Sequence, residues 1–311
     1  MSTLSRLIAI VGPTCTGKTE AAIQLATAIG GEILNADAFQ VYQGMDVGTA
    51  KPTVAEQRRC RFHLIDIVDP CSSFSVAEWC KHAERSIADI EGRGNTPILC
   101  GGAGMYLKAL LQGWTLADSP RNEVLRTELH TIAAHEGNGA VHQILASCDA
   151  VSASRLHPND LVRVIRAIEV FKTTGTPISE LNRRNRVDGT KYSVVQFGFA
   201  WPRSELYSRI DNRVRTMMEG GFPCEVERLL SSGVTRECPG MRSLGYCDVA
   251  DMLHGLLTKD QVIATISLKT RQYAKRQITW FKPDSTIEWL NPCDGDYLGK
   301  MLTGIGKMTA N

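Results

Sequence analysis

The sequence predicts an α/β fold in which a parallel β-sheet carries helices on both faces and an all-helical domain interrupts the chain. Over the first hundred residues, short apolar runs alternate with helical segments, which is typical of strands buried between helices. No strand pattern occurs over 114–191, and a buried strand pattern returns at 192–200. We therefore expect a core formed by 1–117 and 192–311, with a helical insertion at 118–191.

Each predicted element has a local signal. Short apolar runs predict five strands, at 6–12, 31–38, 62–70, 96–102 and 192–200. Ser75 and Glu78 form a capping-box pattern, which predicts a helix from there to about Gly92. Helical spacing predicts the other helices, at 17–31, 123–137, 160–175, 204–221, 224–233 and 259–282.

The composition describes an ordinary folded protein of 311 residues, of which 43% are hydrophobic and 22% charged. The formal net charge is only +2, so any affinity for nucleic acid must come from local clusters of Lys and Arg. Ten cysteines form no C-x-x-C pair, which predicts free, mostly buried thiols in a reducing compartment. The sequence shows no cleavable leader and no bilayer-spanning run, so we expect a cytoplasmic protein without membrane contact.

The segment GPTCTGKT at 12–19 fits the phosphate-binding motif G-x-x-x-x-G-K-[S/T], with a predicted strand before it and a helix after it. It predicts a P-loop NTPase-like sheet, in which backbone N–H groups and Lys18 hold a di- or triphosphate. A plain glycine turn is the alternative. The predicted diphosphate- or nucleotide-binding residues are Gly12, Pro13, Thr14, Cys15, Thr16, Gly17, Lys18 and Thr19, and the Thr19 hydroxyl is the predicted metal ligand, for Mg²⁺.

Asp37 follows the second predicted strand, at the edge of the sheet where open α/β folds place their ligands. We expect it to face the phosphate loop, and its alternative role is that of a turn former. The run 62–70 could also be a Walker B strand ending at Asp66 or Asp69, but acidic residues often follow apolar runs.

Six segments extend this pattern through nearly the whole chain: GPTCTGKT, NADAFQVYQGMDVGTAKP, HLIDIVDP, GGAGMYLKALLQG, HPNDLVRVIRAIEVFKTTG and RQYAKRQITWF. In content and order they resemble the tRNA dimethylallyltransferase family, also called tRNA isopentenyltransferases. Members transfer a dimethylallyl group from dimethylallyl diphosphate to the exocyclic amine of the adenosine 3′ to the tRNA anticodon. The resemblance implies that the loop holds the diphosphate of the prenyl donor, with Mg²⁺ as cofactor and pyrophosphate as leaving group.

The resemblance also implies catalytic roles for Asp37, Lys18, Thr19 and Arg213. An adenine amine is a poor nucleophile, and a positioned carboxylate such as Asp37 could accept its proton, which is typically worth ~10²–10⁴ in rate. Lys18, Mg²⁺ at Thr19 and a further cation would stabilise the departing pyrophosphate. Arg213 matches the family's arginine, and its alternative role is that of a solvated helical arginine.

Two residues depart from the family pattern. Ala103 stands where the family usually has a threonine whose hydroxyl lies in the active site, and such a buried hydrogen bond contributes ~1–3 kcal/mol. Ala38 stands where serine is usual. These differences leave the predicted fold and substrate class unchanged, and they lower the expected catalytic competence.

Two basic runs bear on the tRNA partner. Either run alone could be a solvated face, but two runs in separate domains beside a phosphate-binding core favour tRNA, and the resemblance implies that its anticodon stem-loop is bound. Segment 155–191 holds eight basic and four acidic residues, including a polar stretch NRRNR expected to be a loop, and stretch 269–282 of the helix 259–282 adds five basic residues with no acid between them. Gln40 could bond the edge of a flipped adenine. The predicted tRNA-binding residues are Asp37, Ala38, Phe39, Gln40, Ala103, Val162, Arg163, Val164, Ile165, Arg166, Lys275 and Arg276.

The sequence leaves three alternatives to a monomeric tRNA prenyltransferase. An adenylate isopentenyltransferase acting on free AMP or ADP would need neither the insertion nor the basic helix. A small-molecule kinase of the P-loop class would turn over ATP. A catalytically weakened homologue that still binds tRNA is compatible with Ala103.

Overall fold

The computed structural model describes residues 5–114, 121–185 and 192–309. The chain divides into two compact units. Met1–Leu107 and Tyr192–Asn311 form the first, here called the sheet unit, and Lys108–Lys191 forms the second, the helical unit. The boundaries predicted at 117/118 and 191/192 fall on or beside residues outside the described ranges.

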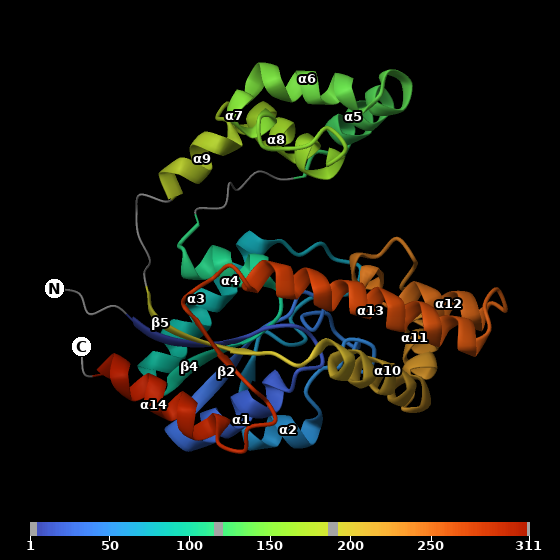
Figure 1. Ribbon diagram of the computed structural model, residues 1–311. Helices are drawn as coiled ribbons and strands as arrows, with labels where there is room; N and C mark the ends of the chain where they lie inside the picture. The colour runs from blue at the N-terminus through green and yellow to red at the C-terminus, as the bar shows by residue number, and fades with distance from the viewer. Residues whose placement is uncertain (1–4, 115–120, 186–191, 310–311) are drawn as a thin grey trace. The chain divides into compact units, whose positions relative to one another are not determined.

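The sheet unit is built on six strands that pair in parallel in the order β3-β2-β4-β1-β5-β6. This confirms the predicted fold class, a parallel sheet with helices on both faces (Figure 1). The strands are β1 Ser5–Val11, β2 Gly31–Ala36, β3 Phe62–His63, β4 Thr96–Gly101, β5 Tyr192–Phe199 and β6 Ile287–Leu290.

The register of the central strands sets up the site. Val11 pairs with Gly101, and Gly101 pairs with Ala36, so β1, β4 and β2 end level with one another. The segments that follow these strands therefore leave the sheet side by side at its carboxyl edge, where open α/β folds bind ligands.

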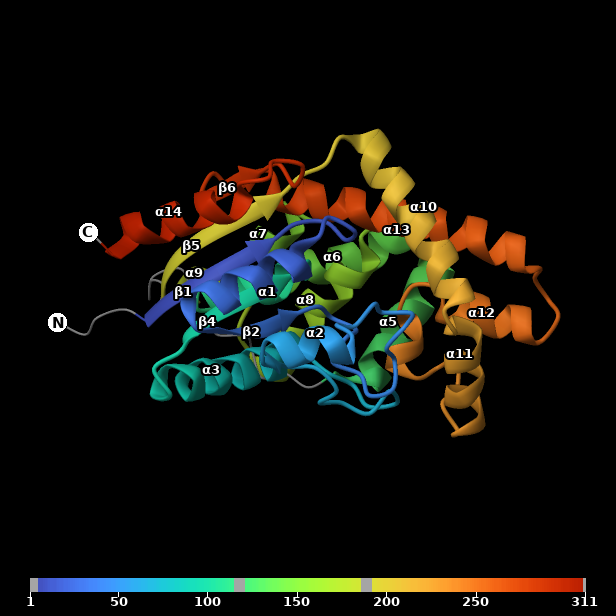
Figure 2. The same cartoon turned by 90° about the horizontal axis from the view of Figure 1, so that it is seen from below.

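Helices cover both faces of this sheet (Figures 1 and 2). α1 (Lys18–Ile29) and α14 (Tyr297–Thr309) pack on one face, where their apolar side chains join those of β1 and β5 in one buried cluster. α3 (Val76–Gly92) lies on the other face, where the fully buried Trp79 donates a hydrogen bond to a β2 carbonyl. The predicted capping box is confirmed, because Ser75 and Glu78 exchange hydrogen bonds at its start.

The other helices of the sheet unit frame its carboxyl edge. α10 and α13 pack together, as do α11 and α12. The bounds are α2 Val54–Arg59, α10 Arg203–Glu219, α11 Phe222–Ser231, η1 Pro239–Arg242, α12 Tyr246–Leu253 and α13 Lys259–Phe281, while α4, Gly104–Leu111, runs across the boundary between the units.

The helical unit has a core of its own. Its described elements are all helices, and α5, α6 and α8 supply an apolar cluster that includes Leu129, Leu145 and Ile168. The bounds are α5 Glu123–Glu136, α6 Asn138–Cys148, α7 Ala150–Ala153, α8 Leu161–Thr174 and α9 Ile178–Asn185.

Three features of the secondary structure differ from the expectation. The strand expected over 62–70 is only two residues long, because Leu64 and Asp66 adopt positive φ angles of 64° and 56° that end the extended chain. β6 was not predicted. The last twenty residues carry little sequence pattern, yet most of them form α14.

The cysteine expectation was also wrong in part. Cys71 and Cys238 form a disulfide, which joins the loop after β3 to the segment before η1. Of the eight free cysteines, only Cys60 and Cys100 are buried. In the part of the chain that the structure describes, no helix is both long and apolar enough to cross a bilayer.

Candidate functional site

The loop between β1 and α1 has the backbone that an anion cradle requires. Gly12 and Gly17 have φ angles of 130° and 90°, and Cys15 between them has a φ of 64°. A Cβ on Gly12 would lie 3.1 Å from the Phe199 carbonyl oxygen of the neighbouring strand. No described side chain caps the first turn of α1, so its N–H groups remain available to an anion.

Lys18 is the cation of this loop. Burial, together with the neighbouring Arg213 guanidinium, lowers its pKa from the ordinary value to about 8, against the opposing influence of nearby Cys100, Cys15 and Asp37. Its Nζ donates a hydrogen bond to the Pro13 carbonyl within the loop. A partly buried ammonium that, among the described residues, forms no ion pair with a carboxylate gains most when a multiply charged anion arrives beside it.

Helix α10 holds the loop from one side. The Arg209 Nε donates to the Cys15 carbonyl at 2.8 Å, and Arg213 Nη1 contacts Thr14 Oγ1 at 3.3 Å. The Trp201 indole donates to the Thr16 carbonyl at 3.1 Å. Arg213, predicted from its motif, thus reaches the loop. Arg209 and Trp201 were not predicted, because nothing in their local sequence indicates a contact nearly two hundred residues away.

Helix α13 holds the loop from another side through Gln277. Its Oε1 accepts the Thr14 N–H at 2.8 Å, and its Nε2 donates to the Gly102 carbonyl at 3.0 Å. A Cβ on Gly102 would lie 2.0 Å from this Nε2. The absence of a side chain at Gly102 therefore makes room for Gln277, which bridges the phosphate loop and the end of β4. Gln277 belongs to the RQYAKRQ stretch, where only the basic residues were singled out from sequence.

Asp37 follows β2, and its two carboxylate oxygens have different surroundings. Oδ1 accepts the N–H of Phe39 at 2.9 Å and that of Gln40 at 3.4 Å, which makes Asp37 a turn former. Oδ2 has no hydrogen-bond partner among the residues that the structure describes. The turn therefore orients the side chain and leaves one oxygen open.

Two further predicted residues, Ala103 and Gln40, have contacts near Asp37. The Ala103 N–H donates to the Ala36 carbonyl at 3.0 Å, so its backbone lies beside the end of β2. The Gln40 amide nitrogen donates to the carbonyls of Thr49 and Ala50 at 3.1 and 3.0 Å. Only the Gln40 amide oxygen, without a described partner, remains to bond an incoming group.

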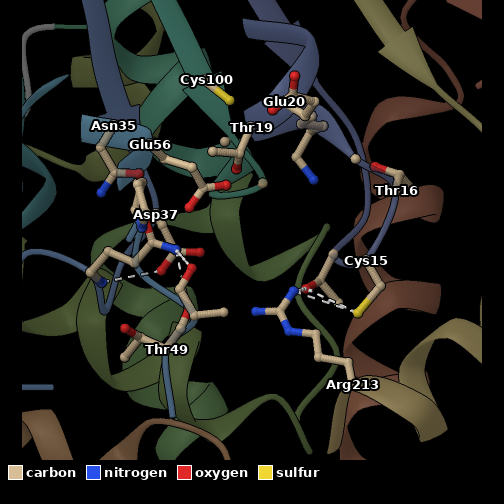
Figure 3. Close-up of a pocket in the computed structure, with 18 of the residues that line it drawn as sticks. Cys15, Thr16, Thr19, Glu20, Asn35, Asp37, Thr49, Glu56, Cys100 and Arg213 are labelled. Carbon is tan, nitrogen blue, oxygen red and sulfur yellow. Dashed lines mark hydrogen bonds between the residues drawn. The ribbon is translucent and has the colours of Figure 1, made fainter. Parts of the chain in front are cut away.

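The phosphate loop, Asp37, Gln40 and Gln277 line one cavity of about 500 Å³ in the sheet unit, and Ala103 is not among its lining residues. In Figure 3, Asp37 and Arg213 face each other across it, with Thr19 at one end. The predicted residues that line it are Thr14, Cys15, Thr16, Gly17, Lys18, Thr19, Asp37, Gln40 and Arg213. A second cavity of about 290 Å³ adds Phe39, Tyr273 and Arg276, and the residues that it shares with the first are Thr14, Cys15, Asp37, Thr49 and Arg213. Asp66, the Walker B alternative, pairs with the buried Lys51.

The predicted tRNA-binding stretch of α8 divides between surface and core. Val164 and Ile165 are buried in the helical unit, whereas the Val162 and Arg163 side chains are exposed. Arg163 pairs with Asp160 at 3.1 Å. Arg166 pairs with the fully buried Glu169 at 2.6 Å, which Arg126 also contacts at 2.8 Å. Within the predicted stretch 162–166, the side chains exposed to a partner are therefore Val162 and Arg163, with Arg166 partly exposed.

The stretch NRRNR was wrongly predicted to be a loop. Most of it lies in α9, where Arg183 and Arg184 both pair with Glu180 at 2.8 and 3.0 Å. Residues 186–191 lie outside the described ranges, and Arg186 and Lys191 with them.

On α13, the basic residues also differ in their partners. Lys269 pairs with Asp248 and Arg271 with Asp211, both carboxylates of other helices. Lys275 and Arg276 are exposed and have no ion-pair partner among the described residues, although the Arg276 guanidinium lies 5.7 Å from the Tyr273 ring. α13 is not the last helix, since α14 follows it.

A glycine loop between a buried strand and a helix, at the carboxyl edge of a parallel sheet, places the fold in the P-loop-like class. The chain belongs to the IPP transferase family, whose model matches residues 40–284.

Relatives of known name cover almost the whole chain. It is 46% identical to tRNA dimethylallyltransferase 2 of Geotalea daltonii, over 92% of this chain and 87% of that protein. It is 45% identical to tRNA dimethylallyltransferase of Geobacter metallireducens, over 95% and 94% of the two chains.

Solved structures similar to this chain carry related names. A tRNA isopentenylpyrophosphate transferase from Bacillus halodurans is 36% identical, with a TM-score of 0.71 and 98% of both chains covered. A eukaryotic dimethylallyltransferase acting on tRNA is 26% identical, with a TM-score of 0.81 over 96% of this chain and 77% of that one.

Proposed function

We propose that this protein transfers the dimethylallyl group of dimethylallyl diphosphate to the N6 amine of the adenosine 3′ to the tRNA anticodon and releases pyrophosphate. The observation that carries the proposal is the cavity in which an anion-binding loop and Arg213 lie opposite an open Asp37 oxygen. Such a transferase needs cationic groups that stabilise the phosphate leaving group and a base that accepts the proton of the nucleophile, and this cavity has both. Names of the relatives supply the substrate class.

The residues of the cavity suit this chemistry. Negative charge grows on the diphosphate as the carbon–oxygen bond breaks, and Lys18, Arg213 and the first turn of α1 would stabilise it. The adenine amine gains positive charge as it bonds to the allylic carbon, and the open Oδ2 of Asp37 would accept its proton. The backbone N–H groups of residues 39 and 40 donate hydrogen bonds to Asp37 Oδ1 and hold the carboxylate in place for this step.

A magnesium ion would fit beside the loop. Mg²⁺ in phosphate sites usually takes one or two protein oxygens together with phosphate oxygens and water. The Thr19 hydroxyl lines the cavity at the start of α1, and no described side chain hydrogen-bonds to it. No cluster of three or more His, Cys, Asp or Glu side chains suited to a metal occurs among the described residues. When bound, the ion would neutralise charge on the diphosphate. We further propose that the protein acts as a cytoplasmic monomer.

The test is mass analysis of anticodon-loop nucleosides after incubation with tRNA, dimethylallyl diphosphate and Mg²⁺. We expect one added dimethylallyl group on the adenosine 3′ to the anticodon, and none with Lys18→Ala. Titration should show that Lys18→Ala weakens binding of both dimethylallyl diphosphate and pyrophosphate. ATP-dependent phosphoryl transfer, or prenylation of free AMP in preference to tRNA, would contradict the proposal.

A further inference from the structure

Glu225 on α11 is a buried carboxylate that the proposed chemistry does not use. It is 5% exposed. Its Oε2 accepts the N–H groups of Asp46 and Val47 at 2.8 and 2.7 Å. Its Oε1 accepts the Gly48 N–H at 3.1 Å and the Tyr246 hydroxyl at 2.6 Å.

Four hydrogen-bond donors thus surround this carboxylate, and no cation pairs with it among the described residues. Three successive backbone N–H groups aimed at one anion form a nest, and hydrogen bonds to a charged acceptor are about twice as strong as neutral ones. Burial raises the pKa of Tyr246 above its ordinary value, so the phenol keeps its proton and donates it. Glu225 therefore fixes the backbone of 46–48.

Other contacts of α11 and α12 act on the same loop. The Arg228 guanidinium, one turn along α11, donates to the Gly44 carbonyl at 3.0 Å. A Cβ on Gly48 would lie 2.3 Å from the Phe222 ring and 2.6 Å from the Tyr246 ring. α11 and α12 therefore hold the loop in three ways: by a hydrogen bond to the Gly44 carbonyl, by hydrogen bonds to the N–H groups of 46–48, and by packing of two aromatic rings against Gly48.

The gripped loop in turn holds the residues that face the cavity. Thr49 and Ala50, directly after the nest, give their carbonyls to the Gln40 amide nitrogen. The Gln40 backbone N–H is one of the two that bond Asp37 Oδ1. Hydrogen bonds, joined by short stretches of the covalent chain, therefore connect Glu225 through the loop to the carboxylate opposite the phosphate loop.

We propose that Glu225 is a positioning residue: from α11 it holds the loop 46–50 in the conformation that orients Gln40 and, through it, the open oxygen of Asp37. The role of the oriented groups rests on the function proposed above. The phosphate loop has separate supports in α10 and α13, so Glu225 acts on the nucleophile side of the cavity and leaves the donor side alone.

The test compares Glu225→Gln with Glu227→Gln, a control on the exposed side of the same helix. The amide that replaces the carboxylate in Glu225→Gln would oppose backbone donors with its own N–H, so the nest loses at least one bond. With the protein shown to be folded by circular dichroism, we expect kcat to fall ~10-fold while the KM and Kd for dimethylallyl diphosphate stay within about twofold. Glu227→Gln should match the wild type.

Hydrogen–deuterium exchange gives a readout that does not depend on the reaction. In Glu225→Gln, amides 46–48 and also amides 39 and 40 should exchange at least several-fold faster, while amides 14–18 stay protected as before. Faster exchange confined to 46–48, or an unchanged kcat in the folded variant, would overturn the proposal.

Tyr246→Phe removes one of the four donors and serves if Glu225→Gln does not fold. We expect a smaller loss of kcat and faster exchange at the same amides, and wild-type behaviour in both measurements would overturn the proposal. A wild-type protein that fails to prenylate tRNA would refute the proposed function, and the exchange measurements would still decide whether Glu225 positions the turn.

Discussion

Strand β2 carries a carboxylate near each end, and the two differ in how completely the protein satisfies them. Glu32 at the amino end is buried and bonded by Arg93 at 3.0 and 2.8 Å, Asn95 at 2.7 Å and His63 at 2.6 Å. Burial acts to raise its pKa, but these hydrogen bonds prevail and hold it at about 2. Asp37, just past the carboxyl end, has one oxygen bonded to its own turn and the other open to a cavity.

The difference separates a carboxylate that stabilises the fold from one that is available for chemistry. Every lone pair that the fold uses at Glu32 is a lone pair that cannot accept a substrate proton. Asp37 keeps an oxygen free because its turn needs only the other one. The basic residues differ in the same way, because some pair with a carboxylate of the protein and others have no described partner. Substitutions can test this difference for each group.

The largest effect is expected at Asp37. Asp37→Asn keeps the turn, since asparagine serves turns nearly as well, but cannot accept the proton. Single-turnover prenyl transfer at saturating tRNA should fall ~10²-fold or more, with substrate affinities and thermal stability little changed. A rate near that of the wild type would reduce Asp37 to a turn former.

Glu32→Ala should show the opposite pattern. Loss of a buried, paired carboxylate is expected to lower the free energy of unfolding by about 3 kcal/mol at neutral pH, while turnover per folded molecule is kept. Because the folded pKa is depressed to about 2, the wild-type contribution is complete above pH 4.5 and is lost as the pH falls toward 2. Urea unfolding at several pH values measures this; a mutant gap that does not shrink in acid would contradict it.

Lys18 tests the distinction for a cation. With a pKa of about 8, part of the Lys18 population is neutral at pH ~8.5, and a bound diphosphate favours the charged form. Pyrophosphate binding at that pH should therefore take up a fraction of a proton, seen as calorimetric enthalpies that vary with the ionisation enthalpy of the buffer. Lys18→Met should bind more weakly and take up none. Equal uptake in both proteins would point to another group.

On the tRNA side, paired and open basic residues should differ. Neutralising Lys275 with Arg276 should weaken tRNA binding and flatten its log–log salt dependence by about one unit for each lost phosphate contact. Arg163 and Arg166 already pair with Asp160 and Glu169, so the double neutralisation there should change the slope less. Pyrophosphate affinity is the control and should not change. Unchanged slopes in both double variants would mean that none of the four residues contacts a tRNA phosphate.

The smallest effect is expected at Ala103, where a polar group is missing altogether. Ala103→Thr should raise turnover by a few-fold without tightening tRNA binding, since the Ala103 N–H bonds the carbonyl directly before Asp37 and we expect a hydroxyl there to act at the reacting centre. Ala103→Val, which has similar bulk and no hydroxyl, is the matched control. A loss of activity in both would mean that the site has packed around alanine.

Much of the fold could be predicted because it depends on local signals. The glycine loop, its flanking strand and helix and the capping box at Ser75 are each encoded within a few residues. The strand expected at 62–70 failed because positive φ angles at Leu64 and Asp66 leave no mark on hydrophobic periodicity. NRRNR failed because Glu180, one turn earlier, pairs with its arginines on a helix.

The candidate site likewise contains residues that local sequence signals indicate and residues that they do not. Asp37 and the phosphate loop follow strand ends that the sequence indicates. Gln277 and Glu225 could not be predicted, because their contacts are to backbone groups far away in the chain, and backbone groups carry no sequence signature. Long-range side-chain contacts to the main chain form the part of the site that only a structure reveals.

The Gln277 bridge has a consequence for synthesis of the chain on the ribosome. The phosphate loop is among the first segments to emerge, yet the side chain that accepts its Thr14 N–H is made 263 residues later. β1 must likewise wait for β5, its parallel neighbour, which follows the helical unit. A nascent chain that stops before α13 contains every residue of the loop motif and lacks the bridge to β4. Competence to bind a diphosphate should therefore arise late in translation, when the last third of the protein closes onto its first twenty residues.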